Sequence, residues 1–311
     1  MKDIPDDIYE EIEIEAKYSG YLKRQLNDIE LFKKDENLKI REDIDYSKIG
    51  GLSREMVAKA VDLGWKEIGI SNHLIVHKDI KMSTGYIQYQ DSRKMKSSTF
   101  AEAYERLAPS AEKIYNAADK YGIKAYVGYE VDYFDYAGWE DELREFLSKI
   151  EYDYLISGNH CFCDKEINGV QKVYDICQNM PAEIMLNIEW YIKNHFNTIA
   201  KAVNSGLFDF LAHFDYVKKI AGSEKYKLVD AEQNVVKALK NTGTACEIST
   251  KGLRRVGEFY PSDEILQMLV KNNIPMLISD DAHCVSELGY AFDKAEEKLY
   301  EVGCKNRFHL K

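Results

Sequence analysis

The sequence predicts an α/β fold built on a mostly parallel sheet, either open or closed into a barrel. From about residue 65 onward, short apolar runs alternate with longer amphipathic stretches, which is typical of successive strand–helix units. The apolar runs hold about four to six residues without polar alternation, which indicates strands buried on both faces. The predicted strands cover residues 66–73, 124–134, 152–160, 208–216, 244–250 and 274–283.

The stretches between the predicted strands repeat apolar residues at three- and four-residue spacing, which predicts helices that each bury one face. Gly122 marks the end of the first of these helices. Ser262 precedes the last one as a cap residue, and two acidic residues follow it in the first turn. The predicted helices span residues 99–122, 139–150, 229–243 and 262–273.

The N-terminal residues do not follow this alternation. Residues 7–43 are highly charged and helical in pattern, and no strand is evident among them. The Gly50-Gly51 doublet then provides a turn. We therefore predict two parts, a short helical extension over residues 1–50 and a strand–helix domain over residues 51–311.

Composition and charge exclude several classes of protein. The net charge of −11 argues against non-specific nucleic-acid binding, which needs a positive surface. No apolar run approaches the ~20 residues that span a bilayer, and the acidic N-terminus lacks the basic start of a signal peptide. The six cysteines form no CxxC pair, so we expect reduced thiols and a cytoplasmic protein.

Five of the six predicted strands end in side chains that bind metal ions. Since the carboxyl ends of parallel strands form the functional face of α/β folds, we expect these side chains to meet. Asp281 and His283 would point to the same side if the last strand continues that far. The candidate ligands are His73, Glu130, His160, His213, Asp281 and His283.

This mixture of nitrogen and oxygen ligands suits Zn²⁺, Mn²⁺ or Fe²⁺ better than Mg²⁺ or Ca²⁺. Two or more such ions clamp a phosphate and lower the pKa of a bound water, which gives a nucleophile at neutral pH. A single histidine at a strand end is most often structural, but chance poorly explains four of the seven histidines at four strand ends. The histidines that we expect to be loop, structural or solvated residues are His77, His195 and His309.

Cysteines and one further glutamate lie beside these candidate ligands. Cys161 and Cys163 follow His160 and are more typical of small buried residues beside a site than of thiolate ligands. Glu247 belongs to a predicted strand, where it either supports the metal site or pairs with a lysine from a helix.

A basic segment, STKGLRRVGEFYPS, follows the fifth predicted strand at residues 249–262. Two arginines and a lysine around a glycine, next to a metal-binding face, could hold a phosphate through bidentate hydrogen bonds. The plainer alternative is a solvated turn. We favour Arg254 or Arg255 as the phosphate anchor.

Taken together, these motifs resemble the PHP superfamily (polymerase and histidinol phosphatase), and within it the histidinol-phosphatase-like proteins. The resemblance implies a distorted (β/α)7 TIM-like barrel with up to three divalent metal ions at the strand carboxyl ends. It also implies hydrolysis of a small phosphorylated metabolite by a metal-bound hydroxide, often L-histidinol phosphate in histidine biosynthesis. The matching stretches are EMVAKAVDLGWKEIGISNH (55–73), GYEVDY (128–133), ISGNH (156–160), LAHFDY (211–216), GLRRVGEFYPS (252–262) and SDDAH (279–283).

The resemblance implies specific roles for the candidate ligands. Glu130 resembles the carboxylate that bridges the first and second metals, and His160 and His213 resemble the other protein ligands of the second. Asp281 is similar to a ligand of the first metal. Glu130 and Asp281 are therefore the candidate catalytic residues.

Three further residues take roles from the same resemblance. His73 and His283 are similar to ligands of the third metal. Arg254 resembles the arginine that holds the substrate phosphate, and Arg255 is its neighbour.

The start of the domain departs from the family pattern. The family's first strand ends in His-x-His, whereas this sequence has no histidine before His73 and has Ser47 and Ile49 at the corresponding positions. Asn72 stands where the family usually has aspartate. The first strand is therefore atypical, and the missing ligands predict fewer bound metal ions and weakened activity.

Residues 5–52 carry a second resemblance. The stretches KYSGYLKRQ, FKKDEN and IDYSKIGGLS are similar to part of the C-terminal helical region of the FAD-dependent, tRNA-modifying glucose-inhibited division protein A family. This raises the alternative of a non-catalytic, degenerate barrel that acts through a protein partner of residues 1–50. Exonuclease chemistry, a third reading, is disfavoured by the acidic charge.

Overall fold

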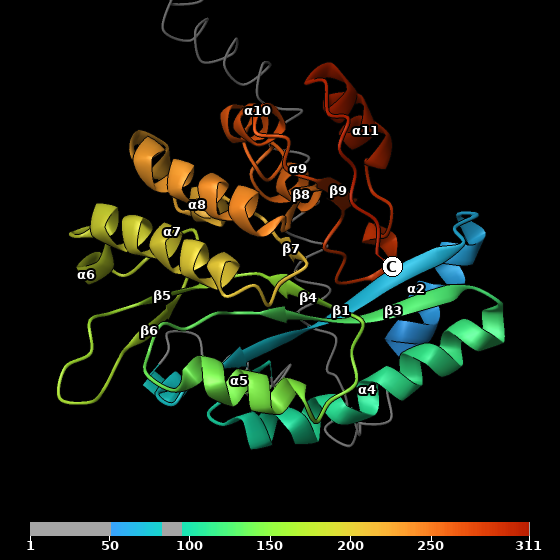
Figure 1. Cartoon of the computed structure of the whole chain (residues 1–311), viewed down its shortest axis with the longest axis horizontal. Coiled ribbons are helices and arrows are strands. Elements are labelled where there is room, and N and C mark those ends of the chain that lie inside the picture. Colours follow the sequence, from blue (N-terminus) through green and yellow to red (C-terminus); the bar gives the residue numbers. More distant parts are fainter. Residues whose placement is uncertain (1–50, 83–94, 311) are drawn as a thin grey trace, which may run out of the picture. The chain divides into compact units, whose positions relative to one another are not determined.

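The computed structural model describes residues 51–82 and 95–310, where strands and helices alternate along the chain (Figure 1). The strands are β1 (Glu67–Val76), β2 (Lys96–Ser97), β3 (Lys124–Val131), β4 (Tyr154–Ser157), β5 (Cys161–Cys163), β6 (Val173–Asp175), β7 (Phe210–Leu211), β8 (Ala245–Ser249) and β9 (Met276–Ser279). The α-helices are α2 (Gly51–Asp62), α4 (Phe100–Tyr121), α5 (Trp139–Leu147), α6 (Ala182–Met185), α7 (Ile188–Asn204), α8 (Val229–Thr242), α9 (Lys251–Arg255), α10 (Asp263–Lys271) and α11 (Phe292–Glu301). The 3₁₀ helices are η2 (Ile80–Met82), η3 (Tyr216–Lys219), η4 (Ser223–Lys225) and η5 (Val285–Glu287). The predicted helical extension over residues 1–50, with Ser47 and Ile49, lies outside the described residues.

The main sheet has seven strands in the order β2-β1-β3-β4-β7-β8-β9, and all neighbouring pairs are parallel. A separate antiparallel pair, β5-β6, was not predicted. Within the described residues β2 and β9 are the two outermost strands, and the sheet does not close. The predicted α/β class with a mostly parallel, TIM-like sheet is confirmed.

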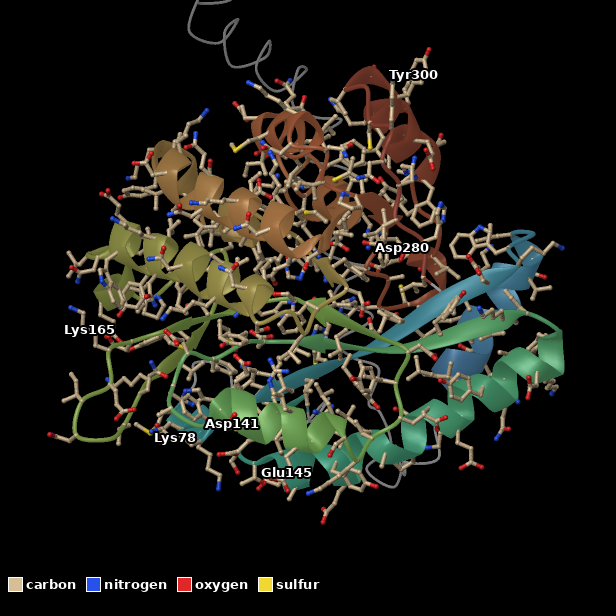
Figure 2. All side chains as sticks on the ribbon, viewed as in Figure 1. Lys78, Asp141, Glu145, Lys165, Asp280 and Tyr300 are labelled. Carbon is tan, nitrogen blue, oxygen red and sulfur yellow. The ribbon has the colours of Figure 1, made fainter. Side chains whose placement is uncertain are left out.

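Both faces of the main sheet are buried. On one face the central strands form an apolar cluster whose members are Tyr126, Tyr154, Ile156, Phe210, Ala212 and Ala245. On the other face the strands pack against helices, and Figure 1 shows α4 and α5 on one side of the domain and α7 and α8 on the other. Charged residues such as Lys78, Asp141 and Glu145 lie on the exposed surface (Figure 2). Burial of both faces explains why the strand sequences lack polar alternation.

Local signals account for most helix boundaries. The Thr99 hydroxyl accepts a hydrogen bond from the Glu102 backbone N–H at the start of α4. Gly122, with φ of 67°, ends the same helix in the left-handed conformation. Ser262 precedes α10 as predicted, but its side chain makes no capping hydrogen bond. Among the described residues, no helix is both long and apolar enough to span a bilayer.

A segment after α11 runs along the outer edge of β9. Met276 N–H donates to Asn306 O at 3.0 Å, and Phe308 N–H donates to Met276 O at 2.9 Å. Beyond these bonds, the Tyr126 hydroxyl lies 3.4 Å from Leu310 O. The segment therefore pairs the edge of β9 that would otherwise be exposed and reaches β3 across the end of the sheet.

Two aspartates at the amino ends of strands bind the backbone of the neighbouring strand. Asp153, directly before β4, accepts a hydrogen bond from the Val127 N–H at 2.7 Å. Asp209, directly before β7, accepts one from the Leu155 N–H at 2.8 Å. These bonds hold the sheet together at the rim opposite the carboxyl ends of the strands.

The buried His195 of α7 predicts a pH-dependent stability. Its ring packs 5.7 Å from the ring of Phe162, and burial lowers the pKa of His195 to about 3. Below pH ~6.5, His195 therefore binds a proton in the unfolded chain but not in the folded chain. The free energy of unfolding falls as pH decreases toward the pKa of the folded state. The contribution is at most ~1.4 kcal/mol per pH unit.

Urea unfolding of His195→Phe at pH 7 and pH 5 checks this expectation. The variant should lose less stability over that interval than the unmodified protein does. His309→Phe, at an exposed histidine, should keep the original pH dependence. An unchanged slope in His195→Phe would contradict the assignment.

Candidate metal centre

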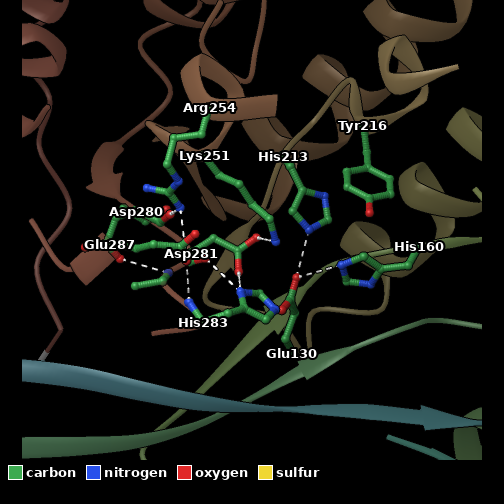
Figure 3. A network of polar contacts seen from close by, with 12 residues as sticks. Glu130, His160, His213, Tyr216, Lys251, Arg254, Asp280, Asp281, His283 and Glu287 are labelled. Carbon is green, nitrogen blue, oxygen red and sulfur yellow. Dashed lines mark hydrogen bonds and ion pairs between the residues drawn. The ribbon is translucent and has the colours of Figure 1, made fainter. Parts of the chain in front are cut away.

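Glu130 lies at the centre of a group of imidazoles (Figure 3). Its carboxylate is buried, and Oε1 lies 2.8 Å from His213 Nε2 and 3.4 Å from His160 Nε2. Oε2 lies 3.4 Å from His73 Nδ1. Three histidines that are far apart in the sequence thus meet around one carboxylate.

Neighbouring strands deliver these side chains. His73 of β1 lies directly opposite Glu130 of β3 in the parallel register. His160 follows the end of β4, and His213 follows the end of β7 with a left-handed backbone, φ of 27°. The carboxyl ends of parallel strands meet at one rim, which is the geometric basis on which the sequence predicted this convergence.

Gly158 makes room for the Glu130 side chain. A Cβ atom at position 158 would lie 2.4 Å from both Cγ and Oε1 of Glu130. No real Cβ tolerates such a contact, so only glycine fits here without displacing the carboxylate.

Asp281 and His283 reach the same rim by a different route from the one predicted. The strand β9 ends at Ser279, so the condition that the strand continue to residue 283 is not met. Asp281 instead has a left-handed backbone with φ of 46°, a sparsely populated conformation that is common at functional sites. His283 Nδ1 lies 3.4 Å from Asp281 Oδ1, and the His283 ring lies 5.8 Å from the ring of His73.

Two further carboxylates bind histidines of the cluster, Asp132 through a ring nitrogen and Glu247 through a backbone N–H. Asp132 Oδ2 lies 2.8 Å from His160 Nδ1, and Oδ1 accepts a hydrogen bond from the His160 N–H. Glu247 accepts hydrogen bonds from the His213 N–H and the Ser279 hydroxyl, so it supports the site. Sequence reasoning missed Asp132, although its spacing of two residues from Glu130 was an available signal.

The protonation states of Glu130 and His73 suit metal binding. Burial alone would raise the pKa of Glu130, but His73 and His160 hold that pKa well below its usual range. Burial lowers the pKa of His73 to about 4, although Glu130 opposes the shift. At His160 the Asp132 and Glu130 carboxylates outweigh burial and raise the pKa. An ionised Glu130 and a neutral His73 are the forms that bind metal ions.

The donor set fits a transition-metal ion. Ligand atoms of His73, Glu130 and His160 all lie within 4.8 Å of one another. Within the described residues, His73 Nδ1 and His160 Nε2 are buried and make no hydrogen bond. Buried polar atoms are normally hydrogen-bonded, so these two nitrogens are available to an ion. Mixed nitrogen and oxygen donors are preferred by Zn²⁺, Mn²⁺ and Fe²⁺.

The predicted phosphate anchors lie on α9, beside this cluster. Arg254 Nη2 donates to Asp280 O at 2.8 Å and lies 3.6 Å from Glu287 Oε2. Its Nε and Nη1 are buried and make no hydrogen bond to any described residue. Arg255 is exposed. Arg254 therefore has donors available, and Arg255 faces solvent.

The remaining candidates of the sequence lie outside the cluster. His77 is buried, with Nε2 2.9 Å from Gln171 Oε1, so it is a structural residue. The thiol of Cys161 contacts Asp175, and burial raises the pKa of both Cys161 and Cys163, which disfavours thiolate ligands. All six cysteines are described residues and all are free. His309 is exposed, as predicted.

Comparisons with known sequences bear out both resemblances. The family profile described as "PHP domain" matches residues 50–251. A Deinococcus radiodurans protein named "Probable histidinol-phosphatase" is 23% identical over 178 residues, which cover 57% of this chain and 64% of the relative. A tRNA uridine 5-carboxymethylaminomethyl modification enzyme MnmG from Caldicellulosiruptor saccharolyticus is 47% identical over 72 residues, 23% of this chain and 12% of the relative. The chain spans less than two thirds of either relative.

Two solved structures share the fold. The histidinol phosphate phosphatase of Lactococcus lactis, crystallised with zinc, L-histidinol and phosphate, matches with a TM-score of 0.54 at 17% identity, covering 82% of this chain and 89% of that one. The HisK protein of Listeria monocytogenes matches with a TM-score of 0.58 at 19% identity, covering 78% and 92%. These similarities establish the architecture.

Proposed function

The chain belongs to the PHP domain family, and from this we propose that it is a metal-dependent phosphoesterase of the histidinol-phosphatase type. The proposed reaction is hydrolysis of a small phosphomonoester, with L-histidinol phosphate, an intermediate of histidine biosynthesis, as the first substrate to test. The observation that carries the proposal is the buried Glu130 carboxylate among three imidazoles, two of which have an unbonded nitrogen. The named histidinol phosphatases among the relatives and fold neighbours support the substrate class.

The protein residues in this proposal hold the ion and orient its ligands. His73, Glu130, His160 and His213 would hold a Zn²⁺, Mn²⁺ or Fe²⁺ ion, which when bound polarises a phosphate and lowers the pKa of a water ligand. Asp132 fixes the ring of His160 so that Nε2 faces Glu130. We propose fewer ions than the three of the family, because no histidine precedes His73.

Cations next to the imidazoles suit an anionic substrate. Lys219 Nζ donates to the Tyr216 hydroxyl at 2.8 Å, and the Tyr216 ring lies 4.7 Å from the ring of His213. Burial, with the neighbouring charges of Lys251 and Arg255, lowers the pKa of Lys219. Lys219 and Lys251 are therefore two positive side chains beside the residues that would hold the ion, where they attract a phosphate group. Arg254 would contribute hydrogen bonds to the phosphate through its unbonded donors, Nε and Nη1.

Phosphate release from p-nitrophenyl phosphate and L-histidinol phosphate tests the proposal. The full-length protein is stripped of metal and reloaded with Mn²⁺ or Zn²⁺. Activity should require the metal, should be lost in His160→Ala, and should be kept in His309→Ala, where an exposed histidine is removed. A protein that binds neither metal and hydrolyses neither substrate would overturn the proposal.

The second candidate is a degenerate barrel without catalysis, which acts through a protein partner of residues 1–50. The short but close similarity to the tRNA-modification enzyme favours it. Metal binding without hydrolysis of any phosphomonoester, together with capture of a partner by residues 1–50, would support this alternative.

A further inference from the structure

Lys251 places a shielded positive charge inside the metal centre. It is the first residue of α9 and comes two residues after the end of β8, so the sheet determines where its side chain starts. Its Nζ lies 2.5 Å from Asp281 Oδ2, and the two side chains are 12% and 14% exposed. Figure 3 shows the ammonium of Lys251 next to Asp281, on the side that faces His213 and Glu130.

Asp281 is engaged by this ammonium and stands apart from the group that fits an ion. The described ligand atoms that lie within 4.8 Å of one another belong to His73, Glu130 and His160. Asp281 instead gives Oδ2 to Lys251 and presents Oδ1 to His283 Nδ1. One candidate ligand of the centre is thus occupied by a side chain of the same protein.

The contact between Lys251 and Asp281 compensates negative charge in the centre. Glu130 is buried and the Asp281 side chain is only 14% exposed, and carboxylate charges that are shielded from water need compensation by nearby opposite charge. Lysine provides a compact point charge on a flexible stem, which can reach a position where a cation would otherwise bind. A divalent ion at Glu130 and the ammonium at Asp281 together carry three positive charges, and the two carboxylates carry two negative charges. The net charge of these groups is then +1, which favours an anionic substrate.

We propose that Lys251 is a built-in cation that takes the place of a metal ion at Asp281. This inference rests on the metal site proposed above and adds a limit to it. The centre keeps one ion at Glu130, and a second ion can bind at Asp281 only by displacing the ammonium. Lys251 is therefore a residue that determines metal stoichiometry.

Mn²⁺ titration of the full-length protein tests this role, with calorimetry for affinity and elemental analysis for stoichiometry. The unmodified protein should bind about one ion tightly, and Lys251→Met should bind a second ion at least ~10-fold more tightly than the unmodified protein does. Lys251→Arg keeps the charge and should keep the original stoichiometry. Lys251→Gln should behave as Lys251→Met does and replaces it if that variant fails to fold.

The control is Lys218→Met, because Lys218 is similarly shielded but pairs with Asp215 at 3.3 Å outside the cluster. This variant should leave Mn²⁺ binding unchanged. The inference is overturned if Lys251→Met and Lys251→Gln bind no more Mn²⁺ than the unmodified protein, or if Lys251→Arg gains the second ion. If the unmodified protein binds no metal, both the proposed function and this inference fail. If it binds about one ion and the Lys251 variants gain none, only this inference fails.

Discussion

Replacing Glu130 with glutamine is expected to remove tight metal binding and, with it, phosphoester hydrolysis. Both carboxylate oxygens face imidazole nitrogens, at distances of 2.8 to 3.4 Å. Glutamine keeps the shape of the side chain but loses the charge and one acceptor oxygen. Because changes to outer partners of metal ligands already cost ~10–100-fold in affinity, we expect a loss of at least ~100-fold here.

Calorimetric titration with Mn²⁺ and phosphate release from L-histidinol phosphate measure this effect. Glu145→Gln is the matched control, since Glu145 lies on the exposed face of α5 and pairs with Lys149, four residues further along the chain. Far-UV circular dichroism should show folded protein for both variants. If Glu130→Gln binds Mn²⁺ as tightly as the unmodified protein does, the carboxylate is not a ligand and the proposed site is wrong.

The Gly158→Ala substitution should damage the fold and the metal centre together. The new methyl group would lie 2.4 Å from Glu130 Cγ and Oε1, so the carboxylate or the backbone of residue 158 must move. Overpacking of this kind typically costs ~1–3 kcal/mol in the free energy of unfolding. The displaced carboxylate would also leave the imidazoles, and we expect metal affinity to fall at least ~10-fold.

Gly128→Ala separates these two effects. A Cβ at position 128 would lie 2.4 Å from the ring of Tyr154, and its nearest neighbours are atoms of that ring instead of Glu130 or an imidazole. Urea unfolding should show a comparable loss of stability in both variants, whereas calorimetry should show reduced Mn²⁺ affinity only in Gly158→Ala. Equal losses of affinity in both would mean that general destabilisation, and not the crowding of Glu130, weakens the site.

The parts of this fold that sequence reasoning predicted are those with local signals. The helix α4 was predictable over its whole length because its apolar spacing is regular and Gly122 ends it. Glu130, His160 and His213 could be grouped because parallel strands place their carboxyl ends at one rim. Both inferences depend on the spacing of apolar residues and on the alternation of strands and helices, which can be read directly from the sequence.

The parts that escaped prediction depend on contacts across the chain. Lys251 meets Asp281 across 30 residues, and Asp132 meets His160 across 28, so side-chain direction decides both pairs. The turn at Asp281 is similarly non-local, because the Asp280 carboxylate accepts a hydrogen bond from the Gly289 N–H. The spacing of Asp132 from Glu130 indicates which side of the strand Asp132 faces, but not that it binds His160. The end of β9 was misjudged because the turn at Asp281 depends on contacts of this kind.

Asp153 and Asp209 secure the strands at their amino ends, whereas the imidazoles gather at the carboxyl ends. These anchoring bonds and the proposed metal centre therefore lie at opposite ends of the strands. A directed-evolution library confined to the loops after the strands would leave the aspartate anchors intact. Such a library would vary the rim at the carboxyl ends of the strands and keep the rest of the fold unchanged.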